Sequence, residues 1–216
     1  MKRQQQLLLL LLAFGVFSIL NTEMGIIGIL PMAAEMYQVD IVQAGLLVSL
    51  FALGVAIAGP TMPLLFSRFN RKRVMLLVLG VFTLCNALAV FASDFEVLLV
   101  LRVVPAFFHP VYCALAFSVA AASVAPEDAP RAVARINMGV AAGMIVGVPI
   151  SNVLAATFDF SVAMAFFAGV TGLMFLLTMA FVPDLPVAQP MRFRTESCAP
   201  YAFSHCAPSC STACYL

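Results

Sequence analysis

Long runs of apolar residues, separated by short polar segments, dominate the chain. The runs are continuous and do not show the alternation of apolar and polar positions that is typical of membrane β-strands. A helix that crosses a membrane needs about 20 mostly apolar residues. Six segments meet this requirement: residues 7–30, 41–63, 74–91, 95–122, 134–157 and 161–182. The pattern predicts six transmembrane helices, because backbone groups in lipid must satisfy their hydrogen bonds within the helix.

The composition indicates the same class of protein. Hydrophobic residues make up 63% of the 216 residues and charged residues only 10%, far from the averages of soluble domains. We therefore expect an all-α integral membrane protein with a six-helix transmembrane domain over residues 1–185. A secretory signal is the alternative for residues 1–30, because a basic start precedes a leucine run. That segment is too long for a signal, and no small-residue cleavage site follows it.

The positions of lysine and arginine predict the orientation of the helices. Basic residues precede the first span, follow the sixth, and occupy the second–third and fourth–fifth connections: Lys2, Arg3, Arg68, Arg71, Lys72, Arg73, Arg131, Arg135, Arg192 and Arg194. The other three connections carry only acids, such as Glu35, Asp40, Asp94 and Asp159. Because positive charge is retained on the cytoplasmic side during insertion, we expect both termini to be cytoplasmic.

Three ionisable residues lie within the expected spans: Glu23, Arg102 and His109. A charge at membrane depth costs several kcal/mol unless it is paired or hydrated. At a rise of about 1.5 Å per residue, Glu23 and Arg102 come to a similar depth in the outer half. We expect them to face one polar cavity and to pair, with His109 nearly two turns deeper. In the alternative, both side chains snorkel to the outer interface. His109 either relays protons or hydrogen-bonds a neighbouring helix.

The fifth span carries Gly139, Gly143 and Gly147 at four-residue spacing, followed by Pro149. Small residues at this spacing allow another helix to approach closely, and the proline is expected to kink the helix near its outer end. Prolines also interrupt the second and fourth spans: Pro60, Pro63, Pro105 and Pro110. Interrupted helices are common in transporters, and the ionisable residues in spans one and four fit an inverted repeat of three plus three helices.

Four motifs, in order and in matching spans, resemble those of one transporter family. The first is the sequence of residues 21–24 with residues 28–31, which combines a Thr-Glu pair with a Leu-Pro ending. The second is the basic connection formed by Ser67, Arg68, Phe69, Asn70, Arg71, Lys72 and Arg73. The third is Arg102, and the fourth comprises Gly139, Gly143, Gly147 and Pro149. Residues 10–185 thus resemble the N-terminal half of a major facilitator superfamily transporter of the drug/proton antiporter group, similar to arabinose-efflux-like exporters.

The resemblance implies proton-coupled efflux of a small organic solute across the bacterial inner membrane. It makes Glu23 the leading candidate for proton coupling, Arg102 its charge partner, residues 67–73 a gating loop and the glycines of the fifth span an antiporter motif. The chain departs from the family at two loop positions, where Ser67 replaces an aspartate and Asn70 a glycine. In the fourth span, Pro105 follows Arg102 where the family has a glycine. The resemblance implies gating through pairing of that aspartate with basic groups, and Ser67 cannot form such a pair.

The length and the last segment also differ from the family, whose members have twelve helices. After the sixth span, residues 186–216 contain cysteines among prolines and serines: Cys198, Cys206, Cys210 and Cys214. Their spacing, with His205, matches no usual zinc pattern. We expect a disordered cytoplasmic tail, translated out of frame after a truncating mutation, and neither a metal nor a cofactor.

Three classes of function follow from these observations. The chain is half of an exporter, which as six helices would have to dimerise to act, or a truncated, transport-inactive fragment that lacks its C-terminal half, or a membrane-embedded enzyme or scaffold. The sequence contains no His-Glu-x-x-His or Gly-x-Ser-x-Gly motif within a span, so an enzyme is disfavoured. The expected partners are membrane lipid, protons and a small molecule, with no nucleic acid. Sugars, nucleosides and hydrophobic drugs remain alternative substrates.

Overall fold

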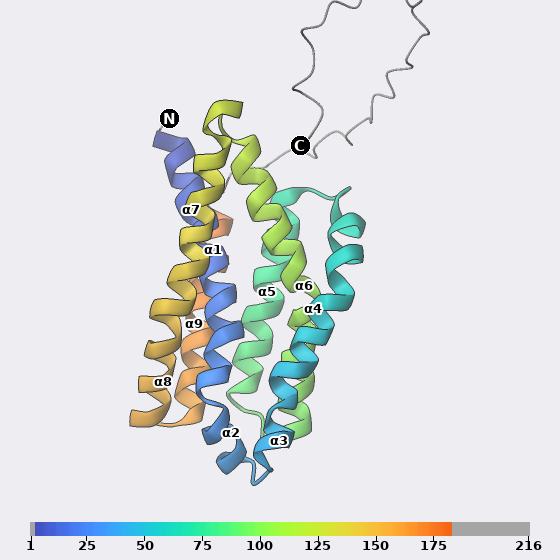
Figure 1. Ribbon diagram of the computed structural model, residues 1–216, viewed down its shortest axis with the longest axis vertical. Coiled ribbons are helices and arrows are strands. Elements are labelled where there is room, and N and C mark those ends of the chain that lie inside the picture. Colours follow the sequence, from blue (N-terminus) through green and yellow to red (C-terminus); the bar gives the residue numbers. More distant parts are fainter. Residues whose placement is uncertain (1–2, 183–216) are drawn as a thin grey trace, which may run out of the picture.

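The computed structural model describes residues 3–182, which form helices joined by short connections and contain no strand (Figure 1). The α-helices are α1 (Arg3–Gly28), α2 (Leu30–Met36), α3 (Ile41–Ala44), α4 (Leu46–Phe66), α5 (Arg71–Ala89), α6 (Phe95–Ala122), α7 (Ala129–Ala142), α8 (Val148–Thr157) and α9 (Phe160–Phe181). A 3₁₀ turn, η1 (Pro126–Asp128), precedes α7, and a π-helical turn, η2 (Gly143–Gly147), joins α7 to α8. The expected tail over residues 186–216 lies outside the described residues.

The prediction of six membrane-spanning helices is confirmed. The spans are Gln4–Gly28, Ile41–Phe66, Arg71–Ala89, Phe95–Ala122, Pro126–Thr157 and Phe160–Phe181. The third span begins three residues earlier than expected because Asn70 caps it: the backbone N–H of Lys72 donates to Asn70 Oδ1 at 3.0 Å. An asparagine at this position satisfies a backbone donor that a helix start leaves without a partner.

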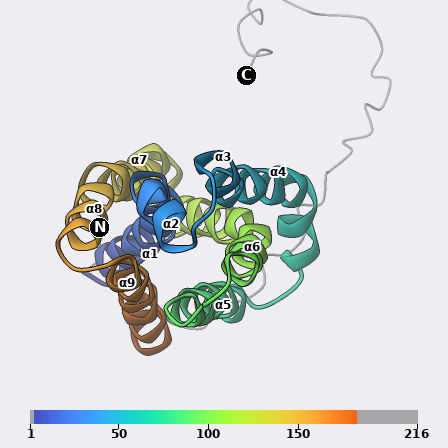
Figure 2. The ribbon, with the colours of Figure 1, turned by 90° about the horizontal axis from the view of Figure 1, so that it is seen from below.

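The helices pack in two groups of three spans, seen from the end in Figure 2. One group contains α1, α7 with α8, and α9, and the other contains α4, α5 and α6. The α4 helix packs along α6 in the same way that the fifth span packs along α1, while α5 packs on α9. Exchanging spans one to three with spans four to six reproduces these neighbours, as an inverted repeat requires.

The fifth span and α1 run side by side in close contact. A methyl group added at Gly143 would lie 3.1 Å from the Phe17 carbonyl oxygen, and those at Gly139 and Gly147 would meet Ala13 and Asn21. The contact positions therefore advance by four residues along both helices. This arrangement confirms the expected use of the glycine face for close helix packing.

The predicted irregularity near Pro149 takes the form of the π turn η2, immediately before that proline. Proline cannot donate the backbone hydrogen bond that an α-helix needs at its position. A π turn bonds to the fifth residue along instead of the fourth, and such turns are frequent at functional sites. The interruption therefore lies at the glycines that contact α1, before Pro149 rather than after it.

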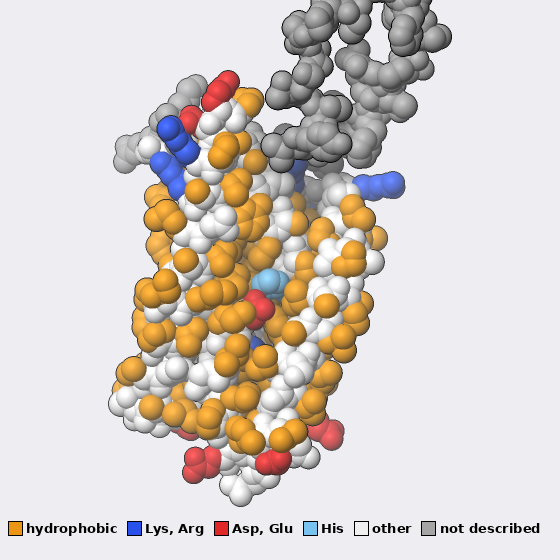
Figure 3. All heavy atoms as spheres, viewed as in Figure 1, with side chains coloured by type: hydrophobic (Ala, Val, Ile, Leu, Met, Phe, Trp, Pro, Cys, Tyr) orange, Lys and Arg blue, Asp and Glu red, His pale blue; other side chains and the backbone are white. Residues whose placement is uncertain are grey.

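Charged side chains separate towards the two ends of the bundle (Figure 3). One end carries Arg68 in the connection before α5, Arg73 at the start of α5 and Arg131 at the start of α7, while Glu35 and Asp40 lie at the other end. We call these the basic end and the acidic end. Arg131 lies 3.5 Å from Asp128, so the basic end also contains some acid.

Tyr37 joins three elements at the acidic end. Its hydroxyl donates to the Ala92 carbonyl oxygen at 2.9 Å, and its ring meets Phe95 and Phe160 edge-on at 6.1 and 6.0 Å between centroids. Burial raises the pKa of Tyr37 above its ordinary value of 10.0. The hydroxyl consequently remains a donor throughout the physiological pH range, and it fixes the turn after α2 to the connection between α5 and α6.

Candidate functional site

A carboxylate and an imidazole meet at mid-height in the bundle. Glu23 Oε2 on α1 lies 2.9 Å from His109 Nε2 on α6, and the two side chains are 17% and 13% exposed. Figure 3 shows acidic and histidine atoms side by side on one face, among hydrophobic side chains. Two ionisable groups that are mostly removed from solvent are thus in direct contact within the apolar length of the bundle.

The expected pairing of Glu23 with Arg102 is wrong, because the carboxylate contacts His109 instead. The helical path continues beyond Gly28 through α2, so Glu23 is deeper than the sequence count assumed. At about 1.5 Å per residue, Glu23 lies about 20 Å along the chain from the end of α2, and His109 about 21 Å from the start of α6. Arg102 lies only about 10 Å from that start, nearer the acidic end than either.

Arg102 is almost completely buried, with 2% of its surface exposed, and so does not snorkel. Both of its terminal nitrogens donate to the Thr22 carbonyl oxygen, each at 3.1 Å. Its guanidinium lies 5.5 Å from the centroid of the Phe51 ring. On the same turn of α1, the Thr22 hydroxyl accepts a hydrogen bond of 3.4 Å from Asn86. The turn of α1 that carries Glu23 is therefore held from α5 and from α6.

Glu23 and Arg102 both line a small cavity of about 110 Å³. Its remaining wall is apolar and comes from α1 and α4, including Met24, Ile27, Leu47, Val48 and Phe51. The Phe51 ring also meets the His109 ring edge-on at 6.1 Å. Phe51 thus contacts both Arg102 and His109, although nothing distinguishes it from other apolar residues in the sequence of the second span.

Asn21 is a further polar residue that the motifs did not single out. Its side chain is fully buried, and neither its oxygen nor its nitrogen has a hydrogen-bond partner within residues 3–182. It lies against Gly147 of the π turn, two positions before Glu23 along α1. Successive side chains on a helix differ by about 100°, so Asn21 and Glu23 project from nearly opposite sides of α1. The glycine motif therefore contacts the helix that carries Glu23 from behind.

The predicted gating loop lies at the basic end, away from the residues that line the cavity. Ser67, where the family has an aspartate, donates to the Leu64 carbonyl oxygen at 2.7 Å. Asn70 caps α5, as described above, while Arg68 and Arg73 are exposed and Arg71 and Lys72 are half-buried. The loop is thus an ordered turn between two helices that presents several cations. Its role in gating stays a prediction.

Six helices long and apolar enough to cross a membrane, with no strand in residues 3–182, define a multi-pass membrane protein, and a carboxylate–imidazole contact lies within its apolar length. Comparison with known proteins gives the family: residues 12–197 match the Major Facilitator Superfamily. The chain belongs to this superfamily.

Individual relatives agree with this assignment. The chain is 34% identical over 173 residues to the inner membrane transport protein YdhP of Escherichia coli (strain K12), covering 80% of this chain and 44% of the relative. It is 28% identical over 166 residues to a probable sugar efflux transporter of Helicobacter acinonychis, covering 77% and 42%. The chain thus spans less than half the length of these relatives.

A solved structure confirms the fold. A bacterial homologue of the human lysosomal transporter Spinster, in an inward-facing and unoccupied conformation, superposes with a TM-score of 0.72 at 18% identity. The superposition covers 88% of this chain and 45% of that one. The six helices therefore have the arrangement of one half of such a transporter.

Proposed function

We propose that this six-helix unit is half of a proton-coupled exporter of small organic solutes. The observation that carries the proposal is the contact of 2.9 Å between Glu23 and His109. Carboxylates and histidines inside membrane helices mark proton and substrate pathways in transporters. The name of the Helicobacter relative, a probable sugar efflux transporter, supports the outward direction of transport.

In this proposal, Glu23 and His109 exchange the coupling proton. Histidine changes charge near physiological pH in its ordinary state, so a proton can be held by the imidazole or by the carboxylate. When both groups are charged they attract each other, and when Glu23 is protonated that attraction disappears. The change alters the wall of the adjoining cavity, and a solute bound there would be favoured in one protonation state over the other.

A second six-helix unit completes the pathway in this proposal. The contact between Glu23 and His109 lies on a face of the bundle rather than at its centre (Figure 3). Facing lipid would be costly for such groups, whereas a second unit would enclose them in a hydrated cavity. The partner is a C-terminal half, as the greater length of the relatives suggests, or a second copy of this chain.

We further propose that the basic end is cytoplasmic and that both termini lie on that side of the bacterial inner membrane. The positive-inside rule supports this orientation, since the connections at the acidic end carry no lysine or arginine in the sequence. The loop of residues 67–73 would then face the cytoplasm, where it can take part in gating. The description of the Escherichia coli relative as an inner membrane protein supports this location.

Proton flux in inverted membrane vesicles tests the proposal. We expect vesicles that contain the chain with a second six-helix unit to release a pre-formed pH gradient when a solute is added from a panel of sugars, nucleosides and hydrophobic dyes. Glu23→Gln should abolish this release, because the amide cannot take up a proton. Glu35→Gln, an exposed acid at the acidic end, is the matched control and should retain it. Equal release by Glu23→Gln and the unaltered chain would overturn the proposal.

A further inference from the structure

A larger cavity lies elsewhere on the bundle, between α1 and α7. It has a volume of about 710 Å³ and shares no lining residue with the cavity at Glu23. Leu10, Phe14 and Phe17 line it from α1, and Met138 and Ala142 from α7. This volume lies within the range of about 300–1,000 Å³ that small-molecule sites occupy. We call this cavity the crevice.

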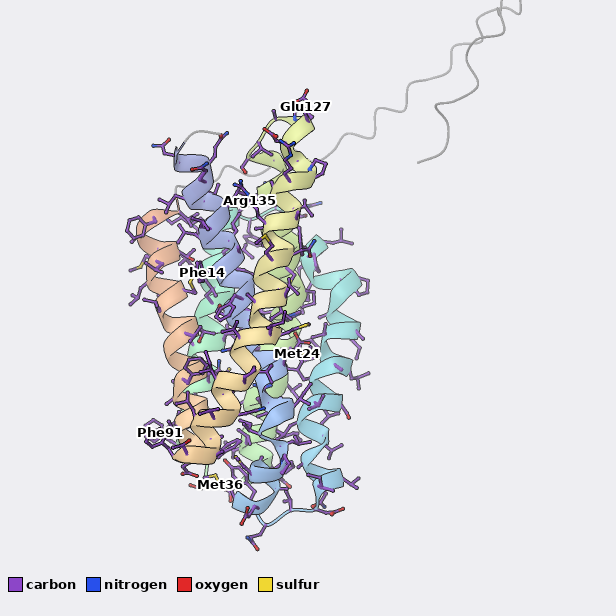
Figure 4. All side chains as sticks on the ribbon, turned by 60° about the vertical axis from the view of Figure 1, so that its left-hand side comes forward. Phe14, Met24, Met36, Phe91, Glu127 and Arg135 are labelled. Atoms are coloured by element: carbon purple, nitrogen blue, oxygen red, sulfur yellow. The ribbon has the colours of Figure 1, made fainter. Side chains whose placement is uncertain are left out.

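The crevice exists because the fifth and sixth spans meet over only part of their length. The outer part, α8, packs on α9, whereas α7 packs mainly on α1 and α6. Towards the basic end, α1 is consequently left uncovered between α9 and α7, as Figure 4 shows. Leu10, Phe14 and Met138 are 55%, 57% and 70% exposed there. Its floor is closed by the contact between Gly139 and the backbone of Ala13.

The length of the crevice corresponds to one leaflet of a bilayer. From Gln6 to Phe17, α1 rises about 16 Å, which is half of a hydrocarbon core about 30 Å thick. The lining is apolar over this length, and polar side chains appear only at the basic end, where Gln6 and Arg135 form the rim. Arg135 lies on α7 and points towards α1 (Figure 4).

We propose that the crevice binds one anionic phospholipid from the leaflet at the basic end. An acyl chain would lie between Phe14 and Met138, and the phosphate would meet Arg135 at the rim. Arginine has five N–H donors, so it can bind a phosphate while keeping another partner. The crevice complements an anionic lipid. Its cation lies at the interfacial end, where the lipid phosphate lies, and its apolar wall extends over the depth of the acyl chain. This proposal does not depend on proton coupling.

Tryptophan fluorescence provides the test, because the chain contains no tryptophan. Phe14→Trp places a single reporter in the crevice, and Met138→Trp is a second reporter from the other wall. The full chain is reconstituted in bilayers of phosphatidylcholine with a small share of brominated lipid, either phosphatidylglycerol or phosphatidylcholine. The control is Leu173→Trp on α9, which is 57% exposed outside the crevice. Bromine quenches only where the lipid contacts the reporter.

We expect brominated phosphatidylglycerol to quench both crevice reporters at about fivefold lower concentration than brominated phosphatidylcholine. One arginine near the interface contributes about 1 kcal/mol of attraction to an anionic lipid, which corresponds to this ratio. Arg135→Gln in the Phe14→Trp chain should reduce this ratio to about one, and the Leu173→Trp control should show a ratio of about one throughout. A ratio of one at both crevice reporters, or a preference that survives Arg135→Gln, would overturn the proposal. Quenching at Leu173→Trp without quenching in the crevice would show that protein covers it, and would also overturn it.

Discussion

Glu23 on α1 and His109 on α6 form a carboxylate–imidazole contact of 2.9 Å within the apolar length of the bundle. Removing one partner of a buried pair leaves a charge without compensation, at a typical cost of about 3–5 kcal/mol, whereas removing both avoids this penalty. We therefore expect the losses of unfolding free energy in His109→Leu and Glu23→Leu, added together, to exceed the loss measured in the double variant. The coupling energy should be about 1–3 kcal/mol.

Unfolding by detergent titration in mixed micelles measures this coupling. The matched pair is Glu35 and Gln38, whose side chains lie at the acidic end and are linked only by a local backbone contact of 2.8 Å; its cycle should give a coupling near zero. A coupling near zero for Glu23 and His109 as well would mean that their contact makes no net contribution.

Arg102 is predicted to hold α1 through the Thr22 carbonyl group. Arg102→Lys keeps the charge but cannot reproduce two parallel N–H donors, and Arg102→Met removes the donors altogether. We expect the lysine variant to lower the free energy of unfolding by about 1–3 kcal/mol, in the range of hydrogen bonds to charged groups. Because the carbonyl stays hydrogen-bonded within α1 and methionine fills similar space, the methionine variant should be no less stable than the lysine variant. A much less stable methionine variant would contradict this interpretation.

The glycine contacts between α1 and the fifth span predict costs of different size for the same substitution. Gly139→Ala brings a methyl group onto the backbone of Ala13, and such overpacking typically costs about 1–3 kcal/mol. Gly147→Ala meets the Asn21 side chain instead, which can move, so its cost should be smaller. Gly169→Ala on α9 is the control, because its methyl group would meet nothing within 4 Å in the part of the chain that the structure describes, and it should stabilise the helix by up to about 1 kcal/mol. Thermal unfolding of the three variants gives the order.

Tyr37 predicts how the acidic end is held together. Tyr37→Phe keeps both aromatic contacts and loses only the hydrogen bond to Ala92, so the free energy of unfolding should fall by about 0.5–1.5 kcal/mol. Tyr37→Ala also loses the contacts of the half-buried ring and should cost more than Tyr37→Phe. Since burial raises the pKa of Tyr37 above 10.0, the difference between wild type and Tyr37→Phe should be constant from pH 6 to pH 9. A difference that changes within this range would contradict a permanently protonated donor.

The sequence was sufficient to predict the six spans, because apolar length is a direct requirement of the bilayer. It also singled out Glu23, Arg102 and His109, since ionisable groups are rare at membrane depth. The partner of Glu23 could not be predicted, because it depends on α2 extending the first span and on how α1 and α6 align. No sequence pattern or motif singles out Asn21 or Phe51, because their importance comes from contacts with other helices. The π turn was foreseen only as an irregularity at Pro149.

The π turn has a consequence for the register between α1 and the fifth span. In a straight α-helix, positions four residues apart drift by about 40° around the axis, so a contact stripe at this spacing winds away from its neighbour. The turn Gly143–Gly147 contains more residues than an α-helical turn and reverses part of this drift. Ser151, the next position in the series, accordingly still faces Gly25 on α1. If the same residues formed a regular α-helix without the π turn, all of α8 would rotate relative to α7 and Ser151 would be directed away from α1.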